Sequence, residues 1–325
     1  MKTKLWIIRG VLAVLGCLSV LGVRAANTFP DKPLRLYVGF SPGGSVDVVA
    51  RIFADKMKDT LGKSVIVENR TGAGGSIAAD LVAKGEPDGY KLLLQNSGSF
   101  DSAIISKNVN YDALKDFTPI AYIGGSPRVL AVGPSVSVDN VQDLLKVAKK
   151  KPESLRFASE GYGASSHLGL ERISQMSGAK LLHVPFKGGP DALLAVASGQ
   201  ADVTMLTLTT TLPMLRAGKV RPLAVTSLKH ASLLPAVPTL DEAGLKGYEQ
   251  LAWFGITGPA HMPPDVVEAL RKAVFAAAAM PEVKETLAKQ GFDVDVMGPE
   301  AFAAYMQKSA KDTRQVAGEA HIELE

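Results

Sequence analysis

Short apolar segments alternate with longer amphipathic ones along most of this chain, and this alternation restricts its fold more than any other feature. Residues 34–40 are typical of a strand, and residues 46–61 repeat apolar side chains at helical spacing up to Gly62. A strand at 64–67, a helix at 72–84 and a strand at 90–94 follow. Strands that alternate with helices form a mostly parallel sheet covered by helices, so the sequence predicts an α/β fold.

A second series of strands and helices begins after linking strands at 120–123 and 129–132. Its strands are expected at 155–158, 181–184, 203–206 and 222–225, and its helices at 138–150, 165–177, 190–198 and 212–217. A strand at 251–258 and helices at 264–280, 281–290 and 299–317 end the chain. These last helices have no sheet of their own, so we expect them to fold back onto the first half.

The length of 325 residues is enough for two domains. We therefore predict a discontinuous first domain, residues 26–124 and 250–325, with a second domain, residues 125–249, inserted into it.

The first 25 residues have the composition of a secretory signal peptide, with a basic start, an apolar run and a small-x-small site that ends at Ala25. The apolar run of 13 residues is shorter than the ~20 that span a bilayer. An uncleaved membrane anchor and a lipid-modified Cys17 are the alternatives. We expect cleavage before Ala26 and a protein that is exported to the periplasm.

Charge and cysteine content exclude several function classes. Four of the 36 basic residues lie in the leader, so the remainder carries 32 basic and 32 acidic residues. Nucleic-acid binding needs a basic surface, and a neutral mature chain therefore argues against it. Cys17 is the only cysteine, so the mature chain has no disulfide, no thiol nucleophile and no cysteine-bound metal.

Two turns rich in glycine and serine stand at corresponding places, residues 41–47 and residues 159–167, each between a predicted strand and a predicted helix. The first N–H groups of a helix lack intrahelical partners and carry a partial positive charge, so they bind carboxylates or phosphates. Glycine lets a ligand approach the backbone, and serine adds donors. An ordinary turn capped by serine is the alternative for each turn taken alone.

Other chemistry finds little support. The Gly62-Lys63-Ser64 segment lacks the first glycine of a P-loop, and Ile77 replaces the last glycine of a dinucleotide fingerprint. No Gly-x-Ser-x-Gly or His-Glu-x-x-His sequence occurs. We expect His167 to pack or hydrogen-bond locally rather than act as a base, and we predict neither a metal nor a cofactor.

Taken together, the sequence resembles the Bug receptors, the periplasmic solute-binding proteins of tripartite tricarboxylate transporters. The resemblance covers nearly all of the mature length and rests on ordered blocks of sequence. These blocks are Phe29–Arg35, Phe40–Gly44 with Asp47, Val67–Gly75, Pro87–Tyr90, Ser166–Leu168, His183–Gly188, Leu223–Ser227 and Trp253–Gly255. It implies a type II periplasmic-binding fold, two α/β domains that close on a small organic carboxylate in the cleft between them.

The same resemblance implies a monomeric binding protein rather than an enzyme, with integral-membrane transporter subunits as partners. It places the ligand contacts on the two turns, on the loop after the third strand and on two residues nearby. The implied contacts are Phe40, Ser41, Gly43, Gly44, Ser45, Asp47, Asn96, Ser97, Ser159, Gly161, Gly163, Ala164, Ser165, Ser166, Lys187 and Thr207.

Two departures from the family pattern leave the ligand's identity open. Leu206 and Thr207 occupy places that often hold an acidic or amide pair, and residues 102–104 replace an Asn-Pro loop. Leu206 suits a ligand that has no amino group. Two other functions stay open at this point: a secreted serine hydrolase that uses Ser165 or Ser166 with His167, and a ligand sensor or scaffold without transport.

Overall fold

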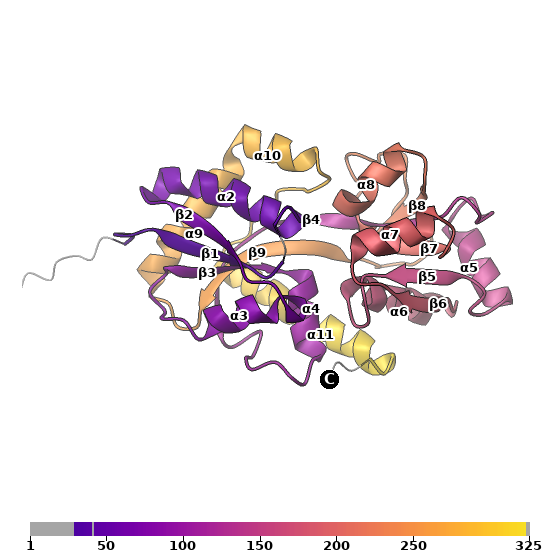
Figure 1. Cartoon of the computed structure of the whole chain (residues 1–325), viewed down its shortest axis with the longest axis horizontal. Coiled ribbons are helices and arrows are strands. Elements are labelled where there is room, and N and C mark those ends of the chain that lie inside the picture. Colours follow the sequence, from indigo (N-terminus) through magenta and orange to yellow (C-terminus); the bar gives the residue numbers. More distant parts are fainter. Residues whose placement is uncertain (1–28, 41, 323–325) are drawn as a thin grey trace, which may run out of the picture.

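The computed structural model describes residues 29–40 and 42–322 of the chain (Figure 1). The predicted leader and its cleavage site lie outside these described residues, as does Ser41. Within them, no helix combines the length and the hydropathy that crossing a membrane requires.

Three strands of the first lobe run parallel: β1 (Leu34–Val38) pairs with both β2 (Val65–Asn69) and β3 (Lys91–Asn96). Two long strands, β9 (Leu251–Pro259) and β4 (Phe117–Val132), then add antiparallel pairs, in the order β2-β1-β3-β9-β4. This arrangement confirms the predicted α/β class and brings the carboxyl ends of the three parallel strands to one edge.

Helices cover both faces of this sheet (Figure 1). On one face lie α2 (Ser45–Leu61), α9 (Pro264–Ala279) and α10 (Pro281–Ala288), whose apolar side chains share one core. On the other lie the short helix η1 (Ala73–Gly75), α3 (Ser76–Ala83), α4 (Ser97–Ile105) and α11 (Pro299–Glu319). The three closing helices thus pack on the first half as expected, although the last turn of α11 also reaches the second lobe.

The second lobe repeats the pattern. Strand β5 (Arg156–Ser159) runs parallel to β6 (Leu182–Pro185) and β7 (Val203–Thr207), while the end of β4 is antiparallel to β7 and to β8 (Arg221–Val225). One apolar core joins α5 (Val141–Lys150) and α6 (Ser165–Ser177), and another joins α7 (Gly189–Ala197) and α8 (Leu208–Arg216).

Strand β4 crosses from one lobe to the other. It pairs with β9 as far as Pro127 and with β7 from Arg128 onward. The prediction of two linking strands was therefore wrong, because residues 124–127, which were expected to separate them, pair with β9 and continue one strand. The change of partner lies close to the predicted start of the second domain, whose boundaries stay a prediction.

The segment after β3 also differs from the prediction of a loop at Asn96 and Ser97. Strand β3 continues to Asn96, and α4 begins at Ser97 without an intervening loop. The Asn96 side chain accepts the Ser99 N–H at 2.8 Å, which caps the new helix. A serine- and glycine-rich segment has low helix propensity, so the cap and the burial of side chains such as Phe100 stabilise this helix.

Candidate functional site

Helices from both lobes begin where the lobes meet: Ser45 of α2 and Thr207, which precedes α8, line one cavity, and Asp101 of α4 contacts Ser165 of α6. In the first lobe, helices α2, α3 and α4 follow the parallel strands β1, β2 and β3, and in the second, α6, α7 and α8 follow β5, β6 and β7. Ligands of open α/β sheets bind outside the carboxyl ends of the strands. This edge of the molecule therefore holds the candidate site.

The first turn is organised by a buried carboxylate. Asp47, 2% exposed, accepts the Gly43 N–H at 2.9 Å, two Arg51 donors at 2.9 Å each, and the Asn69 amide at 2.9 Å. Burial disfavours the charged form of Asp47, but these hydrogen bonds outweigh it and hold the pKa of the carboxyl below its usual value. Asp47 thus fixes the conformation of the turn from its buried side, while Gly43 and Gly44 stay exposed to solvent.

The helices at the centre of the site begin without side-chain caps. The N-cap of α2 is Gly44 and that of α6 is Ala164, and neither supplies a side-chain hydrogen bond to the first turn. Helix α5 is capped by Asn140, which accepts the Asp143 N–H at 2.9 Å, whereas α9, α10 and α11 begin with proline at the first helical position and also lack a side-chain cap. The uncapped ends leave backbone donors for another acceptor.

The second turn, residues 159–166, is held by its own serines. The Ser166 hydroxyl accepts the Glu160 N–H at 3.0 Å, and the Ser159 hydroxyl donates to the Gly161 carbonyl at 3.0 Å. Both serines have no exposed surface. The open part of the turn includes Gly161 and Ala164, which are partly exposed, and Tyr162, which is 52% exposed.

The other residues that were predicted to contact the ligand lie at several positions around the two turns. Phe40 lies against the Gly75 backbone, and Ser45 lines an interlobe cavity of about 10 Å³ together with Thr207. Thr207 also caps α8, because its hydroxyl accepts the Thr210 N–H at 3.3 Å. Lys187 is exposed between β6 and α7. The structure thus brings Ser45 and Thr207 together and uses Asn96 and Thr207 to begin helices.

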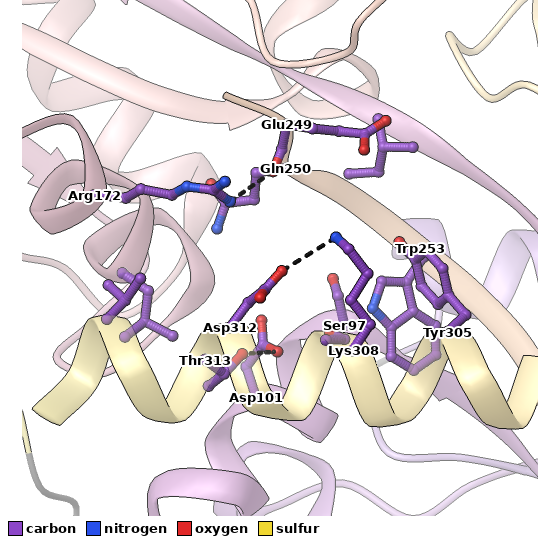
Figure 2. Close-up of a pocket in the computed structure, with 14 residues that line it drawn as sticks. Ser97, Asp101, Arg172, Glu249, Gln250, Trp253, Tyr305, Lys308, Asp312 and Thr313 are labelled. Atoms are coloured by element: carbon purple, nitrogen blue, oxygen red, sulfur yellow. Dashed lines mark hydrogen bonds and ion pairs between the residues drawn. The ribbon is translucent and has the colours of Figure 1, made fainter. Parts of the chain in front are cut away.

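A larger cavity of about 90 Å³ lies between β9, α4, α6 and α11 (Figure 2). Trp253 and Ser97 line it, whereas Phe254, the neighbour of Trp253, faces the smaller cavity. Successive side chains of a strand point to opposite faces, so the two cavities lie on opposite faces of the crossing strands.

Asp101 joins the lobes beside the larger cavity. Its carboxylate accepts the Ser165 hydroxyl of the second lobe at 2.9 Å and the Thr313 hydroxyl of α11 at 3.0 Å (Figure 2 shows the contact with Thr313). Burial raises the pKa of Asp101 to about 6, against the opposing effects of these hydroxyls and of the Arg128 charge. Sequence reasoning had assigned no role to this residue.

The raised pKa of Asp101 predicts that this carboxyl, taken by itself, contributes stability to the fold as the pH is lowered from 7 to 5. The native carboxyl takes up a proton near pH 6, while in the unfolded chain it does so near pH 4. At Asp101 the folded state therefore binds more protons in this window, so the contribution of this group to the free energy of unfolding rises as the pH falls. The lowered pKa of His183 acts in the opposite direction in both the wild type and the variant, so it cancels in the comparison. Urea unfolding of the wild type and Asp101→Asn at both pH values measures the effect.

The expected result is that the wild type gains at least about 1 kcal/mol relative to Asp101→Asn between pH 7 and pH 5, since one pKa unit corresponds to about 1.4 kcal/mol. If the difference in free energy of unfolding between the two proteins were the same at both pH values, or changed in favour of Asp101→Asn at pH 5, the buried placement of this carboxyl would be contradicted.

Arg128 is a second residue that sequence reasoning missed. It is 3% exposed, and its Nη1 donates to the Glu160 carboxylate of the second turn at 3.0 Å. The only sequence signal is a charged residue directly before the apolar run 129–132, which is also typical of an exposed strand end. The pairing of β4 with β7 buries it instead.

The geometry does not assemble a serine hydrolase from the predicted residues. The Ser165 hydroxyl donates to Asp101, the Ser166 hydroxyl accepts from Glu160, and His167 Nδ1 accepts the Gly163 N–H at 3.0 Å. His167 therefore bonds locally, as expected.

A different serine–histidine contact does form, between the Ser159 hydroxyl and His183 Nε2 at 2.6 Å. The His183 ring stacks on the His167 ring, with centroids 3.7 Å apart. Burial and the nearby His167 lower the pKa of His183 to about 4, so the ring is neutral at physiological pH. Because Ser159 has no exposed surface, this contact supports the turn rather than offering a nucleophile. Among the described residues, no group of three His, Asp or Glu side chains is placed to hold a metal.

The family model that describes a tripartite tricarboxylate transporter family receptor matches residues 49–321. The chain belongs to this receptor family. The resemblance to Bug receptors seen in the sequence is thereby confirmed, and the family is one of receptors rather than of enzymes.

Relatives extend over most of the chain. The UPF0065 protein of the tcbD-tcbE intergenic region of Pseudomonas sp. strain P51 is 37% identical, over 85% of this chain and 83% of the relative. The structure of R. palustris Rpa4515 with adipate is 31% identical with a TM-score of 0.81, and covers 91% of this chain and 100% of its own. The periplasmic binding protein BugD is 34% identical with a TM-score of 0.78 and the same coverage. These likenesses confirm the predicted two-lobed solute-binding fold.

Proposed function

We propose that this receptor captures a small organic carboxylate, a di- or tricarboxylate or a related acid, in the periplasm and delivers it to integral-membrane subunits of a tripartite tricarboxylate-type transporter. The observation that carries the proposal is the pair of uncapped helix N-termini, α2 at Gly44 in one lobe and α6 at Ala164 in the other. Both follow turns without lysine or arginine. Such ends bind anions through backbone N–H groups.

In this proposal the N–H groups of Gly44 and Ser45 hold one end of the ligand, beside Gly43, whose own N–H donates to Asp47. Gly161 and Ala164 contact the ligand from the second lobe. Phe40 packs beside the first turn. The hydrogen bonds of Asp47 and Ser166 hold the backbone of the first and the second turn, respectively. Rpa4515 was solved with adipate, which is a dicarboxylate of the proposed class. The protein acts as a monomer.

A ligand screen tests the proposal. Thermal unfolding with di- and tricarboxylates, their methyl esters and amino acids should give a raised melting temperature for at least one acid and none for its ester. A ligand that binds only the native state stabilises it by about 2.7 kcal/mol at a hundredfold excess over Kd. Stabilisation by the ester alone, or by no acid in a broad panel, would contradict the proposal.

Lobe closure is the second expected result. A ligand that bridges two lobes joined by crossing strands favours the closed form, so X-ray scattering should give a smaller radius of gyration with the acid than without it. An unchanged radius at saturating acid would argue against closure. Turnover of a generic ester would instead favour the hydrolase, and binding without any transporter partner would favour a sensor.

A further inference from the structure

Arg128 lies where strand β4 enters the second lobe. Its register partner on β7 is Thr207, which lines the small interlobe cavity with Ser45 of the first lobe. Its main chain is held by Thr226, whose hydroxyl accepts the Arg128 N–H at 2.8 Å. The backbone therefore fixes the base of this side chain beside the candidate site.

The guanidinium of Arg128 is only partly satisfied. Nη1 donates to Glu160 at 3.0 Å, but Nε is buried and has no hydrogen-bond partner among the described residues. Buried polar groups without a partner are rare in native proteins because a donor that is removed from water and left unpaired is costly, more so when it is charged. An arginine that presents a free donor is suited to a planar carboxylate.

The surroundings of the Arg128–Glu160 pair favour a further anion. An added Cβ on Gly189, the first residue of α7, would lie 3.5 Å from Glu160 Oε1 and 3.3 Å from Thr210 Cγ2 in the first turn of α8. The pair therefore lies close to the N-termini of α6, α7 and α8, each of which carries a partial positive charge. The Arg128 cation and these helix ends face the Glu160 carboxylate directly, and the Arg128 charge also acts on Asp101.

We propose that Arg128 is a specificity-determining residue that binds the second carboxylate of the ligand, which makes the ligand a dicarboxylate rather than an amino acid. The inference rests on the proposed function. One carboxylate sits on the uncapped start of α2, and the other reaches Arg128 in the second lobe. An ammonium group at that end would be repelled by the guanidinium, and Leu206, which packs in the apolar core, offers it no acid.

Calorimetry with adipate and hexanoate tests the inference, since the two acids have the same chain length and differ in one carboxylate. The wild type should bind adipate at least tenfold more tightly than hexanoate. Arg128→Gln should weaken adipate binding at least tenfold and change hexanoate binding less than threefold, because charge-assisted hydrogen bonds to the second carboxylate are lost.

Two controls separate this role from a structural one. Arg156→Gln removes an arginine of the same lobe whose ion pair with Asp202 lies at the other end of β5, and it should leave adipate affinity unchanged. The double variant Arg128→Gln/Glu160→Gln leaves no unpaired carboxylate, so it should fold and still fail to prefer adipate.

Equal losses for adipate and hexanoate in Arg128→Gln, or a wild type that binds both alike, would overturn the role of Arg128 and leave the proposed function standing. A wild type that binds neither these acids nor any carboxylate of the thermal screen would refute the proposed function itself.

Discussion

Gly44→Pro should weaken carboxylate binding by about tenfold to about a hundredfold while the protein still folds. Gly44 has a φ of −73°, which the proline ring adopts without strain, and its N–H has no acceptor among the described residues. Proline removes this exposed donor at the start of α2. A hydrogen bond to a charged group contributes about 1.5–3 kcal/mol, which corresponds to this loss of affinity. Calorimetry with the best acid of the screen measures it.

Two further variants complete the comparison. Ser166→Ala should weaken binding only about 2- to 13-fold, because it removes one neutral hydrogen bond worth roughly 0.5–1.5 kcal/mol, here the bond that holds Glu160. Lys187→Met should have the smallest effect, since exposed lysines form weak ion pairs. If Lys187→Met were the most damaging change and Gly44→Pro nearly silent, the ligand would be held by a salt bridge and not by the helix end.

Gly39→Ala should lower both the free energy of unfolding and the ligand affinity. A Cβ at Gly39 would lie 2.6 Å from the Cα and 3.0 Å from the carbonyl oxygen of Gly75, and both are backbone atoms that cannot turn away. Gly75 in turn is packed against Phe40 and Ser99. Overpacking of this kind costs about 1–3 kcal/mol, and here it displaces the first turn directly.

The matched control is Gly318→Ala on helix α11, where the added methyl group would have no neighbouring atom within 4 Å. It should be neutral or stabilising by up to about 1 kcal/mol, because alanine has the higher helix propensity. Urea unfolding and calorimetry compare the two variants. An unfolding curve for Gly39→Ala that matches the wild type would contradict the tight contact between the turns after β1 and β2.

Local sequence pattern predicted much of this fold. Helix α2 repeats buried side chains from Val46 to Leu61 at helical spacing and stops at Gly62, whose φ of 66° suits glycine. The two glycine-serine turns were predicted at the right places because a strand end, a glycine and a helix start are all encoded by neighbouring residues. Prediction from neighbouring residues missed the helix that begins at Ser97, because serine and glycine have a weak preference for the helical conformation.

What each turn residue does was decided by the tertiary structure. Asp47 was predicted either to contact the ligand or to favour the start of α2, and contacts with Gly43, Arg51 and Asn69 make it the support of the turn. Sequence shows that an aspartate begins a helix. It does not show which side chain from another strand reaches it.

The sequence by itself thus determined most of the order of strands and helices, the two turns and the family, because these depend on residues close together in the chain. The tertiary structure alone decided that Arg128 meets Glu160, 32 residues further on, and that Asp101 meets Ser165 and Thr313, 64 and 212 residues further on. Burial and charge act through space, so the partners that set the pKa of Asp101 and orient Arg128 exist only once the two lobes have packed together.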